Sequence, residues 1–135
     1  RIGKVTLGIY AHKDYLRRRG TPQSQADLLQ HDLIGNDQQQ TIVRGLAAFG
    51  INTAPADFAL RTDDLMAYWA AVQAGLGIGF VADYLARSNP QVTPLLGMFK
   101  IPPLPVWLAV HREIRTNPRI RAVYDFLGAA LPGLL

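Results

Sequence analysis

The 135-residue sequence contains no cysteine and no apolar run approaching the roughly 20 residues that a membrane-spanning helix needs. Without cysteine, disulfide bonds, thiol nucleophiles and cysteine-ligated metal sites are excluded. The opening residues 1–5 also lack the apolar core of a secretory signal peptide. These absences favour a cytoplasmic protein with no membrane partner, although exported proteins can also lack cysteine.

Residues that could support catalysis or bind a metal are sparse. The histidines are far apart in the sequence and form no His-x-x-x-His or acid–histidine pair, so no metal site is predicted at His12, His31 or His111. The only serines, Ser24 and Ser88, fall at a predicted helix cap and in a turn, outside any G-x-S-x-G motif. No cofactor is expected.

The one pair of adjacent carboxylates is Asp63-Asp64. Adjacent helical residues point about 100° apart, so these side chains are poorly placed to act together as an acid and a base. Acidic residues in the first turn of a helix are instead favoured by the helix dipole. A role in polarising a ligand is the alternative, and we expect no enzyme activity.

The composition, with 49% apolar and 18% charged residues, is that of one globular domain. The net charge of +4 would suit a nucleic-acid partner, but the basic residues form only two short groups, at 17–19 and 112–121. No basic stripe alternates with aromatic residues, as single-stranded nucleic acid would require. A solvated surface is therefore favoured over a protein-binding patch, and direct DNA contact is the least favoured interpretation.

Apolar periodicity predicts strands and helices that alternate along nearly the whole chain. Thr62 is the predicted cap of the central helix, and Leu65, Trp69 and Val72 form its predicted buried stripe. Trp107 is also expected in the core. The alternation indicates an α/β fold with a mostly parallel sheet and helices on both faces. The predicted strands are 4–10, 32–35, 58–61, 78–81, 92–96 and 105–110, and the predicted helices are 14–19, 25–30, 41–49, 63–74, 83–87 and 117–131.

Gly75, Gly77 and Gly79 form a G-x-G-x-G pattern similar to that of a dinucleotide-binding loop. In such loops the glycines leave a strand and open a helix, whose N-terminus meets the phosphates. Here they leave a predicted helix and enter a strand, so they would present helix carbonyls, which repel phosphate. A helix stop and close packing of helix against sheet explain the pattern better.

The most informative pattern is the position of polar residues at strand ends. In an open parallel sheet, ligands bind outside the carboxyl ends of the strands. Four predicted strands, taken as running in one direction, end at Tyr10, Gly35, Arg61 and Phe80. Their ends should line one edge that offers hydroxyl, amide, imidazole and backbone N–H groups to a small molecule. The candidate ligand-binding residues are Ala11, His12, Gly35, Asn36, Asp37, Thr62, Asp63, Phe80 and Val81.

Three stretches of the sequence resemble the effector-binding domain of LysR-type transcription regulators and keep the order of that family. No single stretch is specific, but all three together span about residues 5–131. They are YLRRRGTP with ADLLQHDLI (15–22 and 26–34), AAVQAGLGIGF with YL (70–80 and 84–85), and PLPVWL with PRIRAVYDFL (103–108 and 118–127).

The resemblance implies a Rossmann-like lobe of the type II periplasmic-binding-protein fold. Residues 1–111 would form the second lobe with both crossing strands, at 5–10 and 106–110, and residues 112–135 would form a helix that returns to a first lobe. It also implies a small-molecule effector bound between the lobes and a homodimer or homotetramer. DNA contact would come only from an N-terminal winged helix-turn-helix domain, which is missing from this sequence.

Two features depart from the family. Residues 37–49 are predicted to be helical, whereas many relatives are irregular or extended there, which puts Asn36 and Asp37 in doubt as ligand contacts. The residue after Val81, often proline in relatives, is Ala82.

Two alternative functions come from other classes of protein. The chain could be one lobe of a periplasmic solute-binding protein, because the lobe architecture is shared. An upstream signal sequence, in place of a helix-turn-helix, would show this. A small enzyme on the same fold, of the dehydratase type, is less favoured, because the sequence shows no groups with catalytic spacing.

Overall fold

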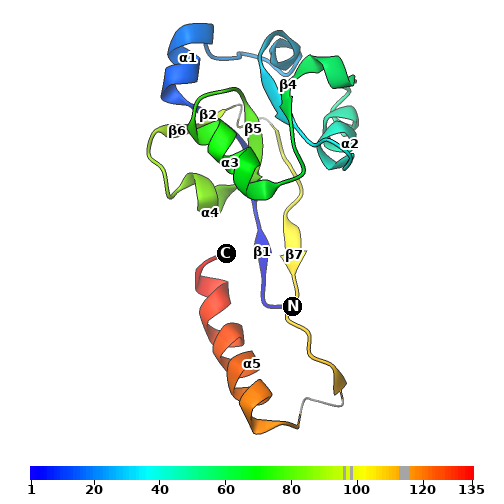
Figure 1. Ribbon diagram of the computed structural model, residues 1–135, viewed down its shortest axis with the longest axis vertical. Helices are drawn as coiled ribbons and strands as arrows, with labels where there is room; N and C mark the ends of the chain where they lie inside the picture. The colour runs from blue at the N-terminus through cyan, green and yellow to red at the C-terminus, as the bar shows by residue number, and fades with distance from the viewer. Residues whose placement is uncertain (96, 98, 113–115) are drawn as a thin grey trace. The chain divides into compact units, whose positions relative to one another are not determined.

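Figure 1 shows the computed structural model of the chain, which describes all residues except 96, 98 and 113–115. The chain forms two compact units. The larger unit contains residues 8–100, and the smaller unit contains residues 1–7 together with 101–135. Both ends of the sequence therefore belong to the smaller unit.

The larger unit alternates strands with helices, as the sequence predicted. Its strands are β2 (Leu7–His12, starting one residue before the unit boundary), β3 (Leu33–Gly35), β4 (Phe58–Arg61), β5 (Gly79–Ala82) and β6 (Val92–Leu95). Its α-helices are α1 (Lys13–Arg19), α2 (Thr41–Ala48), α3 (Leu65–Gln73) and α4 (Asp83–Ala86), with 3-10 segments η1 (Ala26–Gln30) and η2 (Pro55–Asp57).

Hydrogen bonds join these strands into a mixed arrangement. β3 and β4 are parallel neighbours, with Ile34 opposite Leu60. A parallel bridge between Leu33 and Ile78 connects β3 to the residue that precedes β5. β5, β2 and β6 are neighbours in that order, and β2 and β6 are antiparallel. The α/β class is confirmed, whereas a mostly parallel sheet is not.

Strand β2 runs in the opposite direction to β5. A Cβ atom on Gly8, near the start of β2, would lie 3.0 Å from Oδ1 of Asp83, just beyond the end of β5. A Cβ atom on Gly75, before β5, would lie 3.6 Å from Cβ of His12, at the end of β2. The prediction of four strands with one direction is therefore wrong for β2, because apolar alternation is the same for a strand running either way.

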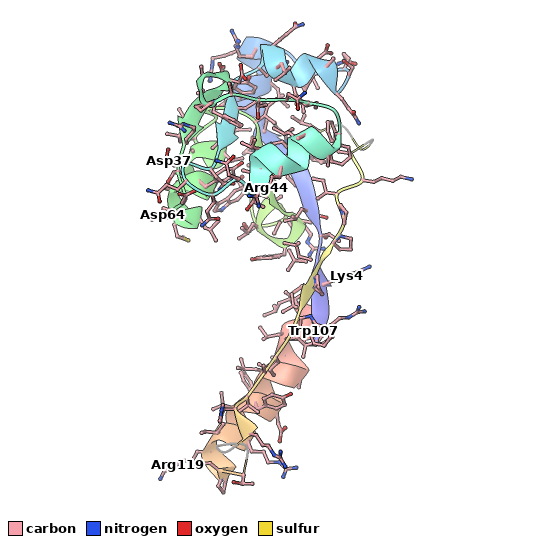
Figure 2. All side chains as sticks on the ribbon, turned by 90° about the vertical axis from the view of Figure 1, so that its right-hand side faces the viewer. Lys4, Asp37, Arg44, Asp64, Trp107 and Arg119 are labelled. Carbon is pink, nitrogen blue, oxygen red and sulfur yellow. The ribbon has the colours of Figure 1, made fainter. Side chains whose placement is uncertain are left out.

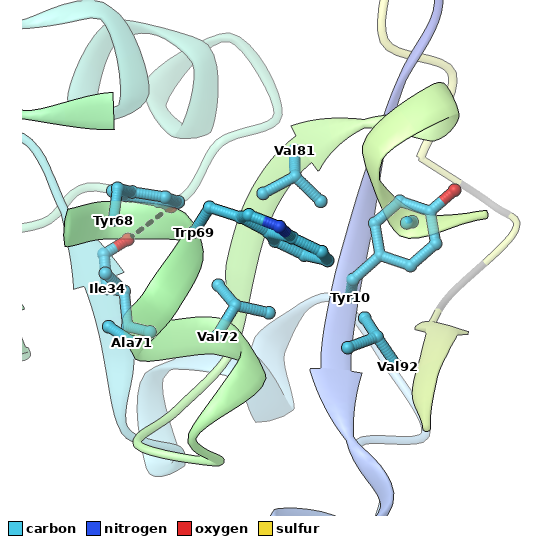
Figure 3. Close-up of a cluster of buried hydrophobic side chains, with 9 residues drawn as sticks. Tyr10, Ile34, Tyr68, Trp69, Ala71, Val72, Val81 and Val92 are labelled. Atoms are coloured by element: carbon cyan, nitrogen blue, oxygen red, sulfur yellow. Dashed lines mark hydrogen bonds between the residues drawn. The ribbon is translucent and has the colours of Figure 1, made fainter. Parts of the chain in front are cut away.

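Helix α3 supplies four of the nine residues in a buried core cluster of the larger unit (Figure 3). Tyr68, Trp69, Ala71 and Val72 are buried along one side of the helix. Trp69 lies in the core as predicted, but Leu65 is 77% exposed and does not continue the buried stripe. The cluster is completed by Tyr10, Ile34, Val81, Ala86 and Val92.

The glycines after α3 have the structural role that the sequence predicted. Gly75 has a φ of 71°, in the left-handed region that favours glycine. A Cβ atom on Gly77 would collide with the carbonyl oxygen of Asp32, and one on Gly79 would collide with the side chain of Val72. The helix therefore ends at a glycine, and the chain then passes too close to its neighbours for side chains.

The smaller unit pairs two short strands and ends in a helix. β1 (Gly3–Val5) and β7 (Leu104–Val106) are antiparallel, with Gly3 opposite Val106. The strand predicted over 4–10 is thus divided at Thr6, and the strand predicted over 105–110 ends at Val106. The side chain of Asn117 caps α5 (Pro118–Ala130), as predicted, and the 3-10 segment η4 (Leu131–Gly133) follows.

Apolar side chains of the smaller unit are largely uncovered. No residue of α5 is buried, and Val123 and Phe126 are 59% and 69% exposed. Trp107 was expected in the core but is 68% exposed, because it follows the last paired residue of β7. None of the described helices is long and apolar enough to cross a membrane.

Candidate ligand-binding site

The carboxyl ends of β3, β4 and β5 lie close together in the larger unit. The backbone N–H of Thr62, after β4, donates a hydrogen bond of 3.0 Å to the carbonyl oxygen of Gly35, at the end of β3. The Tyr68 hydroxyl accepts a hydrogen bond from the N–H of Phe80 on β5 and donates one to the carbonyl oxygen of Ile34 on β3. We call these three strand ends, residues 35–40, 61–66 and 80–82, the carboxyl edge.

Glycine is required where β3 ends at this edge. A Cβ atom on Gly35 would lie 2.5 Å from Cδ1 of Phe58, the first residue of β4. The Phe58 ring is 9% exposed and packs directly over the backbone at Gly35. The Phe58 ring therefore leaves no room for a side chain at position 35.

Asp63 ties the two loops of the carboxyl edge together. Its carboxylate accepts hydrogen bonds from three successive backbone N–H groups, those of Asp37 at 2.9 Å, Gln38 at 2.8 Å and Gln39 at 3.3 Å. These bonds, the one from Gln38 first, hold the pKa of the Asp63 carboxyl below its ordinary range, although desolvation opposes them. The loop after β3 is thus fixed against the loop after β4.

Asp64 caps the helix that follows. Its Oδ1 accepts hydrogen bonds from the N–H groups of Met66 at 2.8 Å and Ala67 at 3.0 Å. Thr62 was the predicted cap, but its hydroxyl instead accepts a hydrogen bond from the Asp64 N–H at 3.2 Å. Threonine and aspartate are both favoured at N-cap positions, so the local sequence does not show which of Thr62 and Asp64 caps α3.

Two polar side chains of the β3 loop, those of Asn36 and Asp37, bind within the protein. Oδ1 of Asn36 accepts a hydrogen bond of 3.3 Å from the N–H of Ile42, in the first turn of α2. Asp37 pairs with Arg61, with an Nη1–Oδ1 distance of 3.4 Å. The helix predicted over 41–49 is confirmed as Thr41–Ala48. The extension of that helix back to residue 37 is wrong, because residues 36–40 form an irregular segment in which the N–H groups of residues 37–39 donate to Asp63.

The surface of the carboxyl edge combines amide and apolar groups. The side chains of residues 38–40, all glutamine, are exposed. Leu65 and Met66, at the start of α3, are 77% and 76% exposed. Asp37 and Asp64 lie on the same side of the larger unit (Figure 2). This combination is suited to holding a small molecule, because a few polar groups can fix its orientation and apolar side chains can cover it.

Ala11 and His12 were predicted at this edge, and the structure places them at the opposite one. His12 lies beside Gly75, before β5 begins, because β2 runs opposite to β5. Its ring Nδ1 accepts a hydrogen bond of 3.0 Å from the N–H of Asp14 and caps α1. Ala11 is fully buried. The prediction that all four strand ends share one edge is therefore wrong for these two residues.

The structure brings the other predicted residues together, with one qualification on β5. Gly35, Asn36, Asp37, Thr62 and Asp63 form the two joined loops described above. Phe80 is connected to them through the Tyr68 hydroxyl and is partly exposed. Val81 is 5% exposed and packs in the core cluster.

Sequence reasoning missed the residues that shape the edge from α3. Tyr68 fell between the predicted core positions, and Leu65 was assigned to the buried stripe. The exposed Met66 and the glutamines at 38–40 carry no motif. The acidic pair at 63–64 was the only available signal, and it was interpreted through the helix dipole rather than through hydrogen bonds to a distant loop.

The arginine cluster at the end of α1 is used within the larger unit. Arg17 forms an ion pair with Asp14, and Nε of Arg19 lies 3.4 Å from Oδ2 of Asp32. Nη2 of Arg18 donates a hydrogen bond of 2.8 Å to the carbonyl oxygen of Gly75, at the end of α3. Among the residues that the structure describes, no group of three histidine, aspartate or glutamate side chains could hold a metal ion.

Comparison with known proteins gives a family match over nearly the whole chain. The family described as the LysR substrate binding domain matches residues 1–132. A search of curated proteins gives no match.

Solved structures share the fold at low sequence identity. The regulatory domain of CrgA, a LysR-type transcriptional regulator from Neisseria meningitidis, is 21% identical with a TM-score of 0.74, over 96% of this chain and 66% of that one. Full-length CrgA is 20% identical, with a TM-score of 0.76, over 96% and 46%. The full-length virulence activator AphB of Vibrio cholerae is 20% identical, with a TM-score of 0.69, over 96% and 46%. The chain thus spans less than two thirds of these relatives.

Proposed function

Because this chain belongs to the LysR substrate-binding domain family, we propose that it is the effector-sensing part of a LysR-type transcription regulator. The observation that carries the proposal is the carboxyl edge, where three strand ends and the first turn of α3 converge without groups arranged for catalysis. The domain would bind a small molecule rather than transform it. Binding that favours one arrangement of the regulator would shift its population and change how it contacts DNA.

The proposed effector site consists of the predicted residues that the structure brings together. These are Gly35, Asn36, Asp37, Thr62, Asp63 and Phe80, joined by Leu65 and Met66. Backbone and amide groups would orient the effector, and the exposed start of α3 would cover its apolar part. The family match favours this function over a lobe of a periplasmic solute-binding protein.

The uncovered apolar surface of the smaller unit supports the proposal that α5 packs on another part of the protein. A groove of about 330 Å³ lies between residues 108–110 and α5, lined by Leu108, Ala109, Val110, Arg119, Ile120, Val123, Tyr124 and Leu127. We assign residues 1–111 to the second lobe, with crossing strands at 5–10 and 106–110. Residues 112–135, with α5, would pack on a first lobe elsewhere in the protein. A helix gains most of its stability from packing its apolar face.

The partners of the whole protein follow from the same proposal. It would bind DNA through a separate N-terminal helix-turn-helix domain, act as a homodimer or homotetramer, and work in the cytoplasm. The relatives of known structure are regulators for which this chain matches less than half of the full-length protein, which leaves room for those parts.

A screen of metabolites by thermal shift on the full-length regulator tests the function. A ligand that binds only the folded form raises the unfolding temperature. With a compound found in this way, Thr62→Val should reduce the shift, because Thr62 lies at the carboxyl edge. Thr93→Val, on β6 opposite Ala11, is the matched control and should leave the shift unchanged. A ligand whose effect is lost in Thr93→Val and kept in Thr62→Val would contradict the proposed site.

A further inference from the structure

We infer that the effector presents an uncharged or cationic group to the carboxyl edge, and not a carboxylate, phosphate or sulfate. This inference rests on the function proposed above and names the chemical class of the ligand for that site. Three features support it. The backbone N–H groups at this edge already donate to carboxylates of the protein, acidic residues outnumber basic ones in the two loops, and the first residues of α3 are apolar.

The backbone donors that could bind an anion are already occupied by carboxylates of the protein. Three successive N–H groups, at residues 37–39, form a concave donor set of the kind that binds anions, and all three donate to Asp63. The N–H groups of Met66 and Ala67 both donate to Asp64. An anionic ligand would have to displace one of these carboxylates and then remain close to its negative charge.

The charges of the two loops also oppose an anion. Residues 35–40 and 61–66, all of which the structure describes, contain three carboxylates, those of Asp37, Asp63 and Asp64, and one guanidinium, that of Arg61. Arg61 is paired with Asp37 at 3.4 Å. The only other basic residue between these loops in the sequence is Arg44, whose side chain is exposed on α2 (Figure 2). A negative field of this kind repels anions and attracts cations.

Exposed apolar side chains occupy the N-terminus of α3. A helix that binds an anion there would need free backbone N–H groups instead. Leu65 and Met66 are 77% and 76% exposed at the helix end, directly after the capping Asp64. Exposed apolar side chains at a binding edge favour a ligand with an apolar body. The ligand class that fits is therefore an apolar compound with hydroxyl, amide or amine groups.

Removing the Asp63 carboxylate tests this inference with inorganic sulfate as the probe. Hydrogen–deuterium exchange of the full-length regulator would be followed in peptides covering residues 36–40. Sulfate should not protect these amides in the wild-type protein. In Asp63→Ala the three N–H groups become available, and we expect sulfate to bind about tenfold or more tightly than in the wild type, since charged hydrogen bonds are strong. Asp57→Ala, which removes another aspartate that accepts a backbone N–H, should behave as the wild type.

Several outcomes would overturn the inference. Protection of these amides by sulfate in the wild type would do so, and so would an Asp63→Ala protein that gains no sulfate binding. If Asp63→Ala does not fold, Asp63→Asn removes the charge but keeps one acceptor oxygen, so a smaller gain in sulfate binding than in Asp63→Ala is expected, and no gain would overturn the inference.

The failure of this inference can be distinguished from the failure of the proposed function. If the compound identified by the metabolite screen is an anion that protects residues 36–40, the inference fails and the function stands. If no compound protects the carboxyl edge at all, the proposed effector site itself fails.

Discussion

The hydroxyl group of Tyr68 donates a hydrogen bond of 2.8 Å to the carbonyl oxygen of Ile34 (Figure 3). The Tyr68 hydroxyl oxygen in turn accepts a hydrogen bond of 2.9 Å from the N–H of Phe80. Tyr68 is 5% exposed, and this burial raises the pKa of its hydroxyl well above the ordinary range. One buried hydroxyl thus connects α3 to both β3 and β5 beside the carboxyl edge.

Replacing this hydroxyl should destabilise the protein. Tyr68→Phe leaves a buried carbonyl oxygen and a backbone N–H without this partner, so the free energy of unfolding should fall by about 1–3 kcal/mol. Urea denaturation measures the change. Tyr84→Phe is the matched control, because the Tyr84 ring is 41% exposed, and a loss of equal size in both variants would contradict the prediction.

Acid should release the loop that Asp63 holds. The pKa of this carboxyl is lowered in the folded protein, so its contribution to stability is present above the ordinary pKa of aspartate. That contribution is lost as the pH falls through the lowered value. Amide exchange at residues 37–39, corrected for the intrinsic exchange rate, should rise over this acid range. In Asp63→Asn we expect that rise to be absent. An identical pH profile in the wild type and in Asp63→Asn would show that the Asp63 carboxylate does not hold this loop.

Replacing Gly77 or Gly45 with alanine should change the stability of the protein in opposite directions, because only Gly45 has space for a side chain. Gly77→Ala would force a Cβ atom against the carbonyl oxygen of Asp32, and a cost of about 1–3 kcal/mol is expected for such overpacking. Gly45→Ala, on exposed α2 with nothing within 4 Å of the added atom, should instead stabilise by about 0.5–1 kcal/mol. Thermal unfolding of both variants gives the comparison, and equal signs would contradict it.

Substitutions on the exposed face of α5 should lower the free energy of unfolding only in the full-length regulator, and not in residues 1–135 alone. Phe126 is 69% exposed, so Phe126→Ser should change the stability of residues 1–135 by less than about 0.5 kcal/mol. In the full-length regulator, where we expect a first lobe to cover this side chain, the loss should reach about 3 kcal/mol. Ala129→Ser, on the same helix, is the control. A small effect of Phe126→Ser in both proteins would argue against packing of α5 on a first lobe.

Local patterns in the sequence were sufficient to predict most elements of the fold. Apolar periodicity located the central helix and the short buried strands around it, because which face of a helix or strand is buried depends on neighbouring residues. The glycines at 75, 77 and 79 were correctly assigned to a helix stop and close packing, since helix C-termini favour left-handed glycine. The family resemblance was carried by these same stretches.

Tertiary structure alone decided how those elements form a site. The direction of β2 moved Ala11 and His12 to the opposite edge, and nothing in an alternating strand encodes its direction. The bonds of Asp63 join residues 24–26 positions apart in the chain, and such contacts depend on the path of the backbone between them. Periodicity describes neighbours along the chain, whereas strand direction and these tethers are set by hydrogen bonds between segments that meet only after folding.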